Sequence, residues 1–98
     1  MSNVLNKQPA EVFVVTMHFA SRLTVGETIT SKTVTASIIA TGADATTAVI
    51  KSSTIVGTDI DVGVQGGTDG VNYKITIRVG TSGVNVLEED IIMLVREG

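Results

Sequence analysis

Several residue types are scarce or missing among these 98 residues: there is no cysteine and no tryptophan, and only one proline, one histidine, one tyrosine and two phenylalanines. Without cysteine, the chain cannot form a disulfide, a thiolate nucleophile or a cysteine-bound zinc site. The net charge is only −3, and the seven basic residues are scattered from Lys7 to Arg96. Because no basic stripe exists to neutralise phosphates, we expect no nucleic-acid partner.

Long hydrophobic runs are also absent. The longest covers five residues, 91–95, whereas about 20 are needed to cross a bilayer. Residues 1–8 have neither the basic start nor the apolar centre of a signal peptide. We therefore expect no membrane partner and no signal peptide, and synthesis in the cytoplasm.

Valine, isoleucine and threonine are abundant, with 15, 10 and 14 copies among the 98 residues. These β-branched side chains favour pleated strands over helices. The clearest pattern covers residues 71–79, where every odd position is apolar and every even position is polar. Such alternation is typical of a strand in an antiparallel sheet with one face in a core and one face in water.

Turn signals rich in glycine separate further stretches of this kind, and a helix of any length is not expected. Residues 1–8, followed by Pro9, are predicted to be a flexible arm, and residues 9–98 a single domain.

The acidic triplet at residues 88–90 interrupts the last apolar stretch, which predicts a bulge or an exposed edge there. The expected strands are 11–20, 30–40, 46–51, 53–56, 59–64, 71–79 and 84–96.

This spacing predicts an all-β fold, an immunoglobulin-like antiparallel β-sandwich of about seven strands. Tyr73 begins the penultimate strand just after a glycine-rich corner, where sandwich domains keep a "tyrosine corner" whose hydroxyl bonds upstream backbone. The alternative is an ordinary core tyrosine. Strand parity predicts a core containing Phe13, Val15, Phe19, Val34, Ala36, Ile38, Val62, Tyr73, Ile75 and Ile77.

No set of residues has the spacing of a catalytic, metal or cofactor site. His18 is alone on an alternating strand, without a nucleophile or a carboxylate at a motif spacing, and is interpreted as structural. Asp59 and Asp61 share one face, and with Asp44 and Asp69 they are the candidate ligands of a calcium site, but the spacing is not that of an EF-hand. We expect solubilising carboxylates, no metal, no cofactor and no enzymatic activity.

Glu88, Glu89 and Asp90 are the candidate contact with a partner protein, because charge in an apolar last strand must reach either solvent or a basic partner. Two interpretations stay open. The three acids either contact a basic partner or only guard a strand edge.

Several short motifs occur in order along the chain: Gly-Glu-Thr-Ile at 26–29, Gly-Gly-Thr-Asp-Gly-Val-Asn-Tyr at 66–73, Thr-Ser-Gly at 81–83 and Leu-Val-Arg-Glu at 94–97. Over residues 11–97 this pattern resembles the small immunoglobulin-like virion proteins of tailed phages and prophages, the phage fiber-tail adaptor family. Members usually carry tryptophans in the first two strands, where this chain has Phe19 and Val34.

The resemblance implies a non-enzymatic structural or adaptor protein of a phage or prophage tail. Such a protein would dock other virion proteins through a sheet edge or end loops. The alternative is an immunoglobulin-like adhesion or carbohydrate-binding module, either with or without a dependence on calcium. Against it stands the shortage of aromatic side chains for stacking on sugars, since Phe13, Phe19 and Tyr73 are all predicted to point inward.

Overall fold

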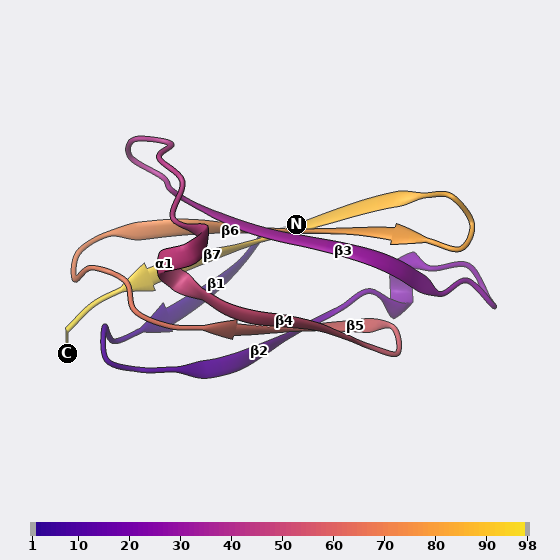
Figure 1. The fold of residues 1–98 in the computed structure, drawn as a ribbon, viewed down its shortest axis with the longest axis horizontal. Helices are drawn as coiled ribbons and strands as arrows, with labels where there is room; N and C mark the ends of the chain where they lie inside the picture. Colours follow the sequence, from indigo (N-terminus) through magenta and orange to yellow (C-terminus); the bar gives the residue numbers. More distant parts are fainter. Residues whose placement is uncertain (1, 98) are drawn as a thin grey trace.

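The computed structural model describes residues 2–97, which form two facing β-sheets (Figure 1). One sheet has the strand order β1-β7-β6-β3 and the other β2-β5-β4. This confirms the expected all-β sandwich. The seven strands of the described residues are β1 (Ser2–Lys7), β2 (Phe13–His18), β3 (Ile29–Ile38), β4 (Ile50–Val56), β5 (Asp59–Val64), β6 (Asn72–Thr81) and β7 (Val86–Val95), with a 3-10 turn η1 (Ala20–Arg22) and a one-turn helix α1 (Thr46–Val49).

The order β2-β5-β4 against β7-β6-β3 follows strands B-E-D and G-F-C of an immunoglobulin sandwich. The first strand departs from the predicted antiparallel arrangement, because β1 runs parallel to β7, from Ser2 opposite Asp90 to Lys7 opposite Val95. Residues 2–7 are therefore a paired strand where a flexible arm was expected, and Met1 lies outside the described residues. The partner of β1 comes from the far end of the chain, so no local pattern indicated the pairing.

Lys7 secures the end of β1 with a buried side chain. Its Nζ donates hydrogen bonds to the carbonyl oxygens of Gln8 (2.8 Å), Pro9 (3.2 Å) and Gly66 (2.6 Å). Burial lowers the pKa of Lys7, while the charge of Glu11 acts in the opposite direction. The three hydrogen bonds join the β1–β2 connection to the loop between β5 and β6.

The core lies between the two sheets and follows the predicted parity. Of the residues expected there, Phe19, Ala36, Val62, Tyr73, Ile75 and Ile77 are buried, and Phe13, Val15, Val34 and Ile38 are partly buried against them. Val12 and Val14, on the other face of the first predicted strand, are 54% and 62% exposed. The predicted inward face of β2 is therefore confirmed.

The middle of the chain differs from the prediction, because residues 46–49 form helix α1 where a strand was expected, and β4 continues without a break from residue 50 to 56. Thr46 explains the local turn: its hydroxyl accepts a hydrogen bond from the Ala36 N–H (2.9 Å) and donates one to Asp44 Oδ1 (2.8 Å). Val49, at the end of the helix, is completely buried. Contacts with β3 thus override the weak strand preference of this segment.

Candidate functional site

The acidic residues 88–90 lie inside β7, which is a central strand between β1 and β6. Its pairing with β6 is unbroken from Asn72 opposite Leu94 to Gly80 opposite Val86. The expected bulge or exposed edge is therefore wrong. The three acids can lie in a central strand because each one faces a basic side chain. Arg78 Nη2 lies 2.9 Å from Glu88 Oε2, Arg22 Nη1 lies 3.0 Å from Glu89 Oε1, and Lys74 Nζ lies 3.6 Å from Asp90 Oδ2.

These three acids point to two different sides of the sheet. Glu88 is exposed on the outer face, where Arg78 donates to it from both Nε (3.0 Å) and Nη2. Glu89 faces the rim between the sheets, and its side chain is only 15% exposed. The Arg78–Glu88 pair is exposed on both sides, and an exposed ion pair contributes little to stability, about 0 to 1 kcal/mol. The geometry of the ion pairs leaves charged groups of both signs on this surface.

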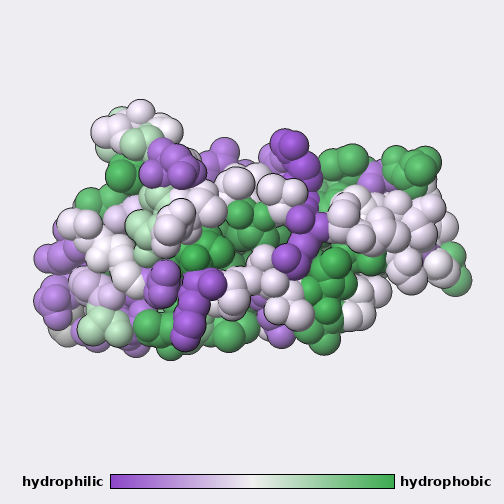
Figure 2. Space-filling model, in the orientation of Figure 1, coloured by the Kyte–Doolittle hydropathy of each residue, from purple (hydrophilic) through white to green (hydrophobic). Residues whose placement is uncertain are grey.

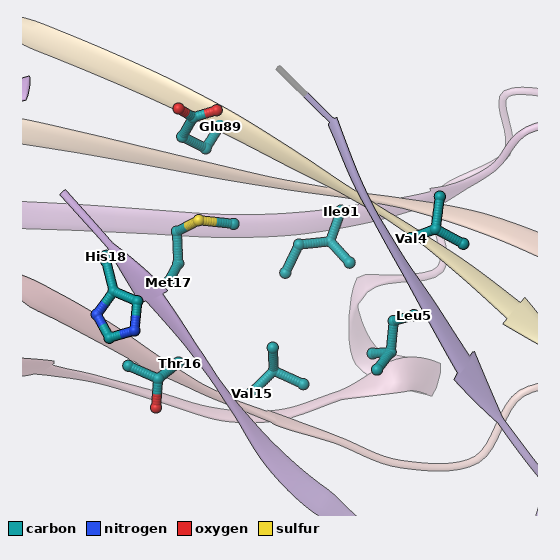
Figure 3. Close-up of a pocket in the computed structure, with 8 residues that line it drawn as sticks. All are labelled: Val4, Leu5, Val15, Thr16, Met17, His18, Glu89 and Ile91. Atoms are coloured by element: carbon teal, nitrogen blue, oxygen red, sulfur yellow. The ribbon is translucent and has the colours of Figure 1, made fainter. Parts of the chain in front are cut away.

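A cavity of about 360 Å³ opens between β1 and β2, the edge strands of the two sheets; we call it the β1–β2 groove (Figure 3). Its apolar lining comes from Val4, Leu5, Val15, Met17 and Ile91, and its polar lining from Thr16, His18 and Glu89. In Figure 3, Leu5, Val15 and Ile91 gather between the ribbons of β1 and β2, with His18 at one end. The prediction from sequence missed this groove, because one wall depends on the unexpected strand β1.

The other residues considered for chemistry are dispersed among local hydrogen bonds. His18 Nδ1 lies 2.9 Å from Asp59 Oδ1, and the Thr16 hydroxyl donates to Asp61 Oδ1 (2.7 Å). Asp44 is bonded to Thr46, and Asp69 Oδ1 accepts the N–H of Glu97 (2.8 Å). Among residues 2–97, no three histidine or acidic side chains come together as a metal site would need.

Tyr73 is buried at the start of β6, and its hydroxyl accepts a hydrogen bond from the N–H of Thr68, five residues upstream (3.0 Å). This is the contact that a tyrosine corner makes. The structural importance of that contact stays a prediction.

Glu27 connects two loops at one end of the sandwich, the β2–β3 connection and the β6–β7 hairpin. Its Oε2 accepts hydrogen bonds from the Thr81 hydroxyl and from Asn85 Nδ2 (2.9 Å), and its Oε1 accepts the N–H of Thr24 (2.9 Å). These bonds, first the one from Thr81, lower the pKa of Glu27. The carboxylate therefore holds both loops in one arrangement.

The same loops carry two valines that contact almost nothing. Val25 is fully exposed and Val84 is 95% exposed, and hydrophobic atoms gather at this end of the molecule, on the right in Figure 2. Val84 is also the one non-glycine residue of the described chain with a positive φ, 56°. A β-branched residue rarely adopts that conformation, because its Cβ approaches the backbone too closely.

Replacing Val84 by glycine is expected to raise the free energy of unfolding by about 1 kcal/mol. Glycine removes the backbone clash, and the exposed valine side chain has almost no packing to lose. Urea unfolding measures the change. The control is Val86→Gly, at an exposed strand position without positive φ. This substitution should lower the free energy of unfolding by about 0.5 to 1 kcal/mol. A loss of stability in Val84→Gly would contradict the strain argument.

The fold and these surfaces define the class of the molecule, a small all-β sandwich with an apolar groove between two edge strands and exposed valines on its end loops. A family model described as podophage GP4 fiber-tail adaptor protein gp77 matches residues 7–94, so the chain belongs to this family of phage tail adaptor proteins. A search of curated proteins gave no match. Among the described residues, no helix has the length and apolar character to cross a membrane.

Proposed function

We propose that the chain is a non-enzymatic adaptor of a phage or prophage tail, made in the bacterial cytoplasm, which docks other virion proteins through a sheet edge or end loops. The family match, which spans nearly the whole sandwich, carries this proposal. Exposed valines on an edge strand (Val14) and on two end loops (Val25 and Val84) support it, because such side chains are available to a partner surface.

The aromatic side chains count against the alternative of a carbohydrate-binding module. Phe19 and Tyr73 are buried, and Phe13 is partly buried against the core. The rings of Phe19 and Tyr73 are therefore closed to a sugar, and the ring of Phe13 is partly covered by the core.

We retain Glu88, Glu89 and Asp90 as part of the contact surface within this proposal. Each acid already has a basic neighbour, so a charged partner would exchange ion pairs at this surface. Exchange of that kind orients the partner and speeds association more than it adds affinity. The other interpretation is that the acids only balance Arg22, Lys74 and Arg78.

The test measures association of the chain with the purified tail and fibre proteins of the same phage. The double substitution Glu88→Gln and Asp90→Asn removes two negative charges from the outer face of the sheet. It does so without placing a new positive charge beside Arg78 or Lys74. We expect the association rate to fall about threefold to tenfold at low salt, with a smaller effect at high salt.

The control is Glu97→Gln, which removes one exposed acid near the C-terminus. An unchanged rate in the double variant would remove residues 88–90 from the contact surface. Failure of the wild-type chain to bind any tail or fibre protein would refute the adaptor function itself.

A further inference from the structure

We propose that the free edge of β2 is a strand-addition site for an extended segment of a partner virion protein. The added segment pairs with β2 through backbone hydrogen bonds and places every second side chain in the β1–β2 groove. The partner class rests on the adaptor function proposed above, whereas the site itself is argued from the four edge strands of the two sheets.

The edges on one side of the sandwich carry features that prevent pairing. Strands β3 and β4 contact each other there. The pairing of β3 shifts register between Ile29 and Ser31, and that of β4 between Ile50 and Ser52. Each strand also contains a lysine, Lys32 or Lys51. Register shifts and lysines are the usual means by which edge strands avoid adding another strand.

The two edges beside the groove lack these features. Strand β2 pairs with β5 without a register shift and contains no Asp, Glu, Lys or Arg. Strand β1 pairs with β7 without a shift, and the Nζ of its one charged residue, Lys7, is occupied by three backbone carbonyls. A regular, uncharged edge rich in β-branched residues is a template for a further strand.

The backbone of β2 presents hydrogen-bonding groups to such a strand. The N–H of Phe19, just beyond β2, donates to Thr58 O (3.1 Å), next to the β5 ladder. Because amide directions alternate along a strand, the N–H and C=O groups of Val14, Thr16 and His18 point away from β5. Since β2 is an edge strand, no other strand of the described chain forms ladder hydrogen bonds with these groups.

The groove supplies the complementary surface for side chains. Leu5, Val15, Met17 and Ile91 make its walls apolar, and its volume of about 360 Å³ is in the range of pockets that enclose a ligand. In a strand added to β2, alternate side chains face the space between the sheets and the others face solvent. The occupant is therefore an extended segment with alternating apolar and polar residues.

The first test uses proline, which removes one N–H and so blocks an added strand. Thr16→Pro acts on an outward amide and leaves the β2–β5 ladder intact. The control is Ser53→Pro on β4. The N–H of Gln65 donates to Val49 O, so the backbone N–H and C=O groups of the odd residues of β5 point toward β4. Ser53 lies opposite an even residue, Val62, and its own N–H therefore points away from β5.

Binding is measured with the purified tail and fibre proteins of the same phage. We expect Thr16→Pro to weaken binding at least about tenfold, the effect of losing one or two backbone hydrogen bonds. Ser53→Pro should stay within about twofold of the wild type. A second pair of variants leaves the backbone unchanged. Thr16 on β2 and Thr54 on β4 lie opposite the same residue of β5, Asp61. Thr16→Lys should weaken binding, and Thr54→Lys should not.

Amide hydrogen exchange separates the possible outcomes. Slower exchange at Val14, Thr16 and His18 in the complex, with Ser53 unchanged, supports strand addition. Binding that survives both Thr16 variants without protection of β2 overturns the inference but leaves the adaptor function standing. Protection of β2 by self-association of the isolated chain makes the occupant a second copy and overturns the partner class. Absence of any wild-type binding refutes the adaptor function and the inference together.

Discussion

Replacing Ile75 by alanine is expected to lower the free energy of unfolding by about 2 to 5 kcal/mol. Ile75 is completely buried in β6, a central strand, opposite Ala36 of β3 and Ile91 of β7. The substitution removes apolar atoms from the core and leaves a cavity that the small side chain of Ala36 cannot fill. Urea unfolding followed by circular dichroism measures the loss.

The matched control for Ile75→Ala is Val86→Ala. Val86 lies on β7 but is 67% exposed, so its truncation should change stability by no more than about 0.5 kcal/mol. A loss below about 1 kcal/mol for Ile75→Ala would mean that the space between the sheets is not packed as the structure shows.

Replacing Lys7 by alanine is expected to lower the free energy of unfolding by about 2 to 3 kcal/mol, because the substitution removes a buried side chain whose charged donor serves three carbonyl oxygens in a partly buried junction. The loss should concentrate at β1, whose end this side chain holds. Unfolding in urea gives the overall change, and hydrogen exchange at the β1–β7 ladder shows where it occurs.

Two further variants sharpen the Lys7 experiment. Lys7→Met keeps most of the apolar stem, so comparison with Lys7→Ala separates the hydrogen bonds from packing. Lys51→Ala removes an exposed lysine of β4 and should cost no more than about 0.5 kcal/mol. If Lys7→Ala were as mild as Lys51→Ala, the three hydrogen bonds would contribute nothing beyond what water supplies.

The sequence by itself determined the all-β class, the strand parities and most of the core. Residues 71–79 alternate without exception, so the inward position of Tyr73, Ile75 and Ile77 follows from the two-residue period of a strand alone. The same local rule placed Phe19 inside and Val14 outside. The resemblance to phage tail adaptors, confirmed by the family match, also came from motifs readable along the chain.

Tertiary structure alone decided which segments become neighbours. Residues 2–7 form a strand because they pair with β7 through backbone hydrogen bonds. Residues 46–49 form a helix because the Thr46 side chain is hydrogen-bonded to β3. Residues 88–90 can lie in a central strand because Arg22, Lys74 and Arg78 arrive from other elements. The β1–β2 groove arises in the same way, from edges that are distant in sequence. Local patterns record which face of a strand is buried, but long-range pairing sets its partners, and the proposed docking site depends on those partners.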